Sequence, residues 1–167
     1  MATVDEIDQS EEIKDCLKQF SKNPQGFLLL SGWNGTGKTY AAEAIFNSFY
    51  CPDSDYHMFT TQTDLNLRWQ KQIKEWGETT YLLNQVTMTK LLVLDDIGTR
   101  VPTEAFMDFL YAVIEKRDRN RSLVGTVITT NMNSSDMRLK FGDAFTSRVA
   151  SGKCFRLESK DRRFKDW

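Results

Sequence analysis

The sequence predicts an α/β protein in which helices cover a mainly parallel sheet. Short apolar runs, typical of buried parallel strands, alternate along the chain with amphipathic segments of helical periodicity. A glycine-rich loop joins the first of these runs to the helix expected after it. The 167 residues include only three prolines, no repeat and no Pro/Gly/Ser-rich linker, so we expect a single compact domain.

The first half of the chain is expected to begin with a helix from about Glu6 to Lys22, where apolar residues recur at helical spacing. The continuous apolar run 27–31 predicts a buried strand, and apolar residues four apart after the glycine-rich loop predict a helix that ends before Pro52. Residues 57–60 are expected to form a strand, and residues 64–76 a helix.

The second half continues the alternation. The strongest strand is expected at 91–94, and Thr103 is expected to cap a helix with one apolar stripe. The β-branched segment 124–130 predicts a fourth strand, and a last strand is expected near 154–157.

Composition and charge exclude several classes of protein. With 22 Lys plus Arg against 23 Asp plus Glu, the net charge is −1, so any basic binding site must be local. The chain has no apolar run of about 18 residues and its acidic start lacks the pattern of a signal peptide, which favours a cytoplasmic protein with no membrane partner. Neither the widely spaced Cys16, Cys51 and Cys154 nor the structural histidine His57 suggests a disulfide framework or a zinc site.

The glycine-rich loop matches the phosphate-binding pattern G-x-x-x-x-G-K-[ST] between an expected strand and an expected helix. Its backbone N–H groups and the positive end of the following helix suit phosphate oxygens, Lys38 suits the β and γ phosphates, and the Thr39 hydroxyl suits Mg²⁺. An ordinary glycine-rich turn with an exposed lysine is the alternative. The expected contacts to the nucleotide are Gly32, Trp33, Asn34, Gly35, Thr36, Gly37, Lys38, Thr39 and Tyr40.

Two further strands are expected to end in polar residues that suit such a site. After the apolar run 91–94, Asp95 is expected near Mg²⁺, and Asp96 is expected to orient or deprotonate water. A pair of acidic turn residues before Gly98 is the alternative. Asn131, which follows the strand 124–130, is either a group that reaches the γ-phosphate or the water, or a plain turn residue.

These segments together resemble the AAA+ ATPase domain of DnaC-type helicase loaders and of their relative IstB, a transposition helper. The resemblance covers about residues 26–163 and is carried by residues 32–39, 91–98 with their Asp-Asp-Ile-Gly ending, 127–131 and 145–149. It implies a three-layer P-loop NTPase with a five-stranded parallel sheet in the order 5-1-4-3-2, and ATP and Mg²⁺ as cofactors.

The resemblance also implies roles for individual residues. Asn131 would be sensor 1, Arg148 an arginine finger that reaches a neighbouring subunit's nucleotide, and Arg162 or Arg163 a sensor 2 arginine. For Arg148, a helix-surface arginine paired with Asp143 or Glu158 is the alternative that the residues alone favour.

The sequence departs from the family in three ways. Typical AAA+ proteins carry Asp-Glu where this chain has Asp95-Asp96, which predicts slow hydrolysis. From the short stretch before Asn23 we expect no N-terminal helicase-binding domain of the kind that DnaC-type loaders carry, and from the end at Trp167 we expect no large C-terminal lid. We therefore divide the chain into an N-terminal helical segment, 1–22, and an ATPase domain, 23–167.

The resemblance implies binding of single-stranded DNA, for which the segment 64–76 is the first candidate. Its expected DNA contacts are Arg68, Lys71 and Lys74. The tryptophans of this segment could stack on bases, but a shared helical face favours core packing instead; the residues on that face are Leu65, Trp69, Ile73 and Trp76.

A second basic cluster near residue 120 is either a DNA contact or a solvated helix end. The cluster consists of Lys116, Arg117, Arg119 and Arg121.

The function expected from this resemblance is that of an ATPase that assembles with copies of itself, as a hexamer or a filament, and helps to place a replicative DNA helicase on single-stranded DNA. The short form would suit a phage or a mobile element. A transposition helper like IstB, which recruits a transposase, and a nucleotide-dependent module that sequesters a helicase are the alternatives.

Overall fold

The computed structural model describes residues 1–49 and 56–158 and contains a five-stranded sheet in the order β2-β3-β4-β1-β5, with every neighbouring pair parallel. The order confirms the 5-1-4-3-2 arrangement that the family resemblance implies. The strands are β1 (Gly26–Ser31), β2 (His57–Thr61), β3 (Leu91–Ile97), β4 (Gly125–Thr130) and β5 (Lys153–Arg156).

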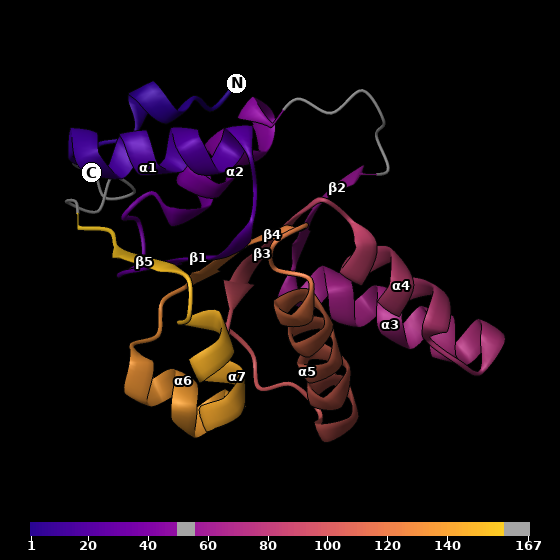
Figure 1. Cartoon of the computed structure of the whole chain (residues 1–167). Helices are drawn as coiled ribbons and strands as arrows, with labels where there is room; N and C mark the ends of the chain where they lie inside the picture. The colour runs from indigo at the N-terminus through magenta and orange to yellow at the C-terminus, as the bar shows by residue number, and fades with distance from the viewer. Residues whose placement is uncertain (50–55, 159–167) are drawn as a thin grey trace, which may run out of the picture.

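Helices cover both faces of the sheet and give the predicted three layers (Figure 1). On one face lie the 3₁₀ turn η1 (Val4–Glu6), α1 (Glu11–Lys22) and α2 (Lys38–Ser48). On the other lie α3 (Gln62–Trp76), α4 (Thr80–Met88), α5 (Glu104–Arg119), α6 (Ser134–Phe141) and α7 (Asp143–Val149). None of the helices within residues 1–49 and 56–158 combines the length and apolarity needed to cross a membrane.

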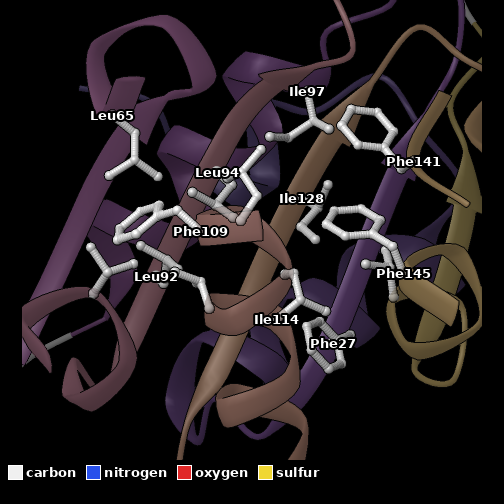
Figure 2. Close-up of a cluster of buried hydrophobic side chains, with 14 of the residues drawn as sticks. Phe27, Leu65, Leu92, Leu94, Ile97, Phe109, Ile114, Ile128, Phe141 and Phe145 are labelled. Carbon is white, nitrogen blue, oxygen red and sulfur yellow. The ribbon is translucent and has the colours of Figure 1, made fainter. Parts of the chain in front are cut away.

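The central strands are buried on both sides, because alternate residues point to opposite layers. In β1, Leu28 and Leu30 pack toward α1 and α2, whereas Phe27 and Leu29 pack toward the helices of the other layer. Figure 2 shows the second of these clusters, in which side chains from three strands meet those of α3, α5, α6 and α7. The continuous apolar runs in the sequence follow directly from this two-sided burial.

Two differences from the predicted helices have local causes. The helix predicted from about Glu6 begins at Glu11, because the Ser10 hydroxyl caps it by accepting a hydrogen bond from the Ile13 N–H at 3.4 Å. The helices α4, α6 and α7 were not predicted, because each is short and buries only two or three residues.

The apolar stripe of α3 is buried only along its first half. Leu65 is fully buried, and the Trp69 ring lies 5.5 Å from that of Phe106. Ile73 is 40% exposed and Trp76 is 60% exposed, because the last turns of α3 extend past the core. Core packing is therefore confirmed for Trp69 and wrong for Trp76.

Arg117 is a second correction, since it is not a surface residue. It is 1% exposed, and its guanidinium donates to the carbonyl oxygens of Val86 and Thr89, both at 2.9 Å. It also donates to Gly125 O at 2.5 Å and to Thr126 Oγ1 at 2.7 Å. Arg117 thus joins the end of α4 to the start of β4 and is unavailable to DNA.

Candidate nucleotide-binding site

The phosphate-binding motif forms a tight turn between the end of β1 and the start of α2. Gly37 has a φ of 88°, a left-handed conformation that favours glycine. Gly32 lies close to Leu157, the residue that follows β5. A Cβ atom on Gly32 would stand 2.5 Å from the Leu157 carbonyl oxygen. The glycines at these positions are therefore required by the backbone path.

The ammonium group of Lys38 lies inside this turn. The residue is 7% exposed, and its Nζ donates to the carbonyl oxygens of Gly32 at 3.0 Å and Trp33 at 2.7 Å. Lys38 is also the first residue of α2, so its positive charge and the positive end of the helix dipole coincide. This combination attracts anions.

Two threonines hold the Asp95 carboxylate. The hydroxyl of Thr39, at the start of α2, lies 3.1 Å from both Asp95 carboxylate oxygens. The Thr129 hydroxyl, near the end of β4, donates to Asp95 Oδ1 at 2.6 Å. Asp95 is 5% exposed, so its charge lies in a buried, oxygen-lined position next to the phosphate-binding turn.

Asp96 is turned away from regular strand geometry. Among the non-glycine residues that the structure describes, only Asp96 has a positive φ, of 59°. The pairing of β3 with β4 also shifts register between Leu94 and Ile97, on either side of the acidic pair. The Asp96 N–H donates to Thr129 Oγ1 at 2.8 Å, and its carbonyl accepts from Thr99 Oγ1 at 3.2 Å. Consecutive aspartates thus differ in environment, because Asp95 is buried and Asp96 is half-buried.

Asn131 is brought to the same place as the phosphate-binding turn. It lines a cavity of about 180 Å³ together with Gly32, Trp33 and Arg156. The Asn131 side chain is exposed at this cavity, and Trp33 is largely exposed there as well.

Tyr40 is engaged by the N-terminal segment. Its hydroxyl donates a hydrogen bond to the Glu6 carboxylate of η1. This bond raises the pKa of Tyr40 and lowers the pKa of Glu6, because it favours the neutral phenol and the charged carboxylate. The 3₁₀ turn is therefore tied to the helix that follows the phosphate-binding turn.

Arg148 lies on α7 and contacts α5. Its Nη1 donates to Tyr111 Oη at 2.9 Å, and its Nε lies 3.9 Å from Asp118 Oδ2. The acidic partners suggested by the sequence pair elsewhere, Asp143 with Arg138 and Glu158 with Arg156.

The position of Asp118 locates Arg148 relative to the phosphate-binding turn. Asp118 stands in the last turn of α5, which returns the chain to the start of β4, whereas the turn follows the end of β1. Since β1 and β4 are parallel neighbours, the start of β4 and the end of β1 lie at opposite ends of the strands.

The basic residues predicted on α3 border a groove against α4. The groove has a volume of about 240 Å³, and Arg68, Lys71, Trp76 and Tyr81 are among the residues that line it. Arg68 Nη2 donates to Gln85 Oε1 at 2.8 Å, and Lys71 Nζ lies 3.8 Å from Glu75 Oε1.

Three other candidate residues lie outside the groove or outside the described part of the chain. Lys74, also on α3, is exposed but does not line the groove. Arg162 and Arg163 lie outside the described residues.

Sequence reasoning assigned no separate role to Thr129, which contacts both aspartates of the site. The expected strand order contained the signal, because it places β4 next to β3 and therefore puts the polar ends of these two strands side by side. A hydroxyl two residues before Asn131 is then a neighbour of Asp95.

The strand order, the phosphate-binding turn after β1 and the acidic pair at the end of β3 define an AAA+ nucleotide-binding fold. Residues 8–150 match the family of IstB-like ATP binding proteins, and the chain belongs to that family.

Known proteins of DNA replication are also similar to this chain. The replicative helicase loader DnaC of Escherichia coli K12 is 25% identical over 137 residues, which cover 81% of this chain and 54% of that relative. The chain therefore spans about half the length of the curated relative it matches.

Two solved structures share the fold. The crystal structure of the DnaC helicase loader superposes with a TM-score of 0.77 at 22% identity, covering 94% of this chain and 97% of that one. The replication initiator DnaA bound to AMPPCP and single-stranded DNA gives a TM-score of 0.79 at 16% identity, covering 95% and 50%.

Proposed function

We propose that this protein is a Mg²⁺-dependent ATPase of the DnaC type that assists the placement of a replicative helicase on single-stranded DNA. The observation that carries the proposal is the buried Asp95 carboxylate, which two threonines hold beside the phosphate-binding turn. The similarity to the helicase loader DnaC supports a replicative helicase as the proposed partner.

The residues of the site fit ATP and Mg²⁺ by their chemistry. The turn offers backbone N–H groups and the Lys38 ammonium to phosphate oxygens, and the Thr39 hydroxyl and Asp95 carboxylate are hard oxygen ligands that lie 3.1 Å apart. Thr39 and Asp95 would hold Mg²⁺, which would supply positive charge to offset the negative charge of the phosphates.

The half-buried Asp96 is the residue proposed to orient the attacking water and accept its proton. The Asp96 N–H donates to the Thr129 hydroxyl, and this hydrogen bond fixes the backbone position from which the carboxylate extends. Asn131, exposed at the cavity that Gly32 also lines, is proposed to hydrogen-bond the γ-phosphate or the water. Because an aspartate reaches less far than a glutamate, we expect slow turnover in the absence of partners.

Self-association is proposed because Arg148 lies near the amino ends of the parallel strands, whereas its own phosphate-binding turn follows the carboxyl end of β1. From there it is suited to a neighbouring subunit's nucleotide, where a guanidinium stabilises charge on the γ-phosphate. The assembly would be a hexamer or a filament.

Single-stranded DNA is proposed to bind along α3. The groove against α4 combines two cations, Arg68 and Lys71, with the exposed ring of Trp76, and Lys74 lies on the same helix. Cations that follow the phosphates and aromatic rings that stack on bases are the usual components of such sites.

The proposal is tested by measuring ATP hydrolysis with and without single-stranded DNA, together with loading of a purified replicative helicase onto a closed single-stranded circle. We expect hydrolysis that needs Mg²⁺ and rises with DNA, and loading that needs ATP. Binding of ATP and helicase without turnover or loading would contradict the proposal and support a module that sequesters the helicase.

A transposition helper is the second candidate, and membership of the IstB-like family favours it. Such a protein would use the same ATPase site to recruit a transposase. A preference for duplex over single-stranded DNA, measured at equal salt concentration, would support this candidate against the helicase loader.

A further inference from the structure

The guanidinium of Arg148 is held by two side chains of α5. Its Nη1 donates to Tyr111 Oη at 2.9 Å, and its Cζ lies 5.3 Å from the centroid of the Tyr111 ring. Its Nε stands 3.9 Å from Asp118 Oδ2. A hydrogen bond, a cation–π contact and an ion pair therefore act on one side chain.

The contact with Asp118 is electrostatic rather than a hydrogen bond, because 3.9 Å exceeds hydrogen-bond length. The same carboxylate lies 3.8 Å from Arg121 Nη1, and its buried Oδ1 has no hydrogen-bond partner. Asp118 thus attracts Arg148 without fixing it. An arginine held in this way can exchange this contact for one with a more negative group, such as the phosphates of a nucleoside triphosphate.

The helix that carries Tyr111 and Asp118 is also linked to the ATP site of its own subunit. The chain passes from Asp96 at the end of β3 through the Thr103 cap into α5. The Thr103 hydroxyl accepts from the Phe106 N–H at 3.4 Å, which fixes the start of the helix. Tyr111 and Asp118, which hold Arg148, therefore lie on α5, the first helix after the acidic pair at the end of β3.

We propose that Tyr111 and Asp118 are positioning residues that aim Arg148 of one subunit at the nucleotide of the next. The inference rests on the proposed action of Arg148 across subunits. Arginine has a long side chain with many rotamers, so a partner that restricts it before assembly lowers the entropy lost when it meets the phosphate. Tyr111 sets the direction through its ring and hydroxyl, and Asp118 adds attraction.

The expected effect is on turnover rather than on ATP affinity. Tyr111→Ala should lower kcat by roughly 10- to 100-fold, since displacing a catalytic group by about 1 Å can lower the rate 100-fold. Tyr111→Phe keeps the ring and should have an intermediate rate. In an Arg148→Ala background, Tyr111→Ala should have no further effect, because the group that it positions is gone.

Mixing subunits separates positioning from a general structural role. Tyr111→Ala keeps an intact phosphate-binding turn and Lys38→Ala keeps an intact Arg148, so their mixture should be more active than either variant alone. A mixture of Tyr111→Ala with Arg148→Ala should not, since both lack a competent arginine. Asp108→Asn, an exposed carboxylate on the same helix, serves as the matched control and should leave the rate unchanged.

Three results would overturn the inference. Recovery between Tyr111→Ala and Arg148→Ala would place Tyr111 at its own subunit's site. Mixing Lys38→Ala with Arg148→Ala should restore activity if Arg148 acts across subunits. If that mixture recovers but Tyr111→Ala has a wild-type rate, the positioning role is removed and the proposed function stays intact. Absence of recovery between Lys38→Ala and Arg148→Ala would instead refute action across subunits. If Tyr111→Ala does not fold, the double variant Tyr111→Phe, Asp118→Asn takes its place in every mixture.

Discussion

The Thr129 hydroxyl donates to the Asp95 carboxylate at 2.6 Å and accepts a hydrogen bond from the Asp96 N–H at 2.8 Å. One residue near the end of β4 thus fixes both acidic residues at the end of β3. Because the two strands are hydrogen-bonded neighbours, the sheet itself sets the geometry of the acidic pair.

Thr129→Val should lower ATP hydrolysis by about 10-fold or more, because it removes one hydrogen bond from Asp95 and leaves the Asp96 N–H without its acceptor. The unfolding free energy should fall by about 1–3 kcal/mol for the same reason. Steady-state hydrolysis and urea unfolding measure the two effects. Thr60→Val, in a buried threonine of β2 whose hydroxyl bonds the Thr61 carbonyl, is the control and should spare hydrolysis.

Lys38→Ala should weaken ATP binding by at least about 100-fold, since hydrogen bonds to charged groups contribute about 1.5–3 kcal/mol each and Lys38 is the dedicated cation of the turn. Equilibrium binding of labelled ATP measures this. Normal affinity in a folded variant would show that phosphates bind elsewhere.

Asp96→Asn should retain Mg-ATP, because Thr39 and Asp95 are unchanged, and should slow hydrolysis by about 10²- to 10⁴-fold. Binding and single-turnover hydrolysis are measured on the same preparation. Loss of binding with an unchanged rate per bound nucleotide would mean that the roles of the two aspartates are reversed.

Local patterns in the sequence were enough to predict the strands and the phosphate-binding turn, whereas the order of the strands was implied by the family resemblance. Strands buried on both faces produce continuous apolar runs, and the turn requires glycines at fixed positions. The burial of Arg117 was not predictable in this way, because most of its acceptors are main-chain carbonyls some 30 residues away, around Val86 and Thr89. Such acceptors leave no signature in side-chain type.

The partners of Arg148 were missed for a related reason. The sequence suggested the nearby acids Asp143 and Glu158, whereas the structure supplies Tyr111 and Asp118 from a helix that packs beside α7 only in the folded chain. Helical periodicity also predicted, wrongly, that Trp76 packs in the core. The periodicity identifies the residues on one face of a helix, but it does not show where the helix extends past the core.

Arg117→Met should lower the unfolding free energy by at least about 3 kcal/mol, because several buried carbonyl oxygens lose a charged donor. Burial lowers the pKa of Arg117 to about 9, so its guanidinium is still charged at neutral pH and makes these bonds there. Arg119→Met, in an exposed arginine of the same helix paired with Glu115, should change stability by less than about 1 kcal/mol. Equal losses in urea unfolding would contradict the structural role of Arg117.

Trp69 and Trp76 provide a matched pair on α3, because one packs into the core and the other is exposed at the groove. Trp76→Ala should weaken binding of single-stranded DNA by about 1–3 kcal/mol and change the unfolding free energy little, since a stacking surface is lost but no core contact. Trp69→Ala should do the opposite and destabilise the fold by about 3–5 kcal/mol.

Fluorescence anisotropy of a labelled oligonucleotide and urea unfolding measure these effects, and a salt series separates stacking from phosphate contacts. Trp76→Ala should leave the slope of log affinity against log salt nearly unchanged, whereas Lys71→Ala should reduce it, because only the lysine releases counterions. If Trp76→Ala binds DNA like the parent at every salt concentration, the groove between α3 and α4 is not the DNA site.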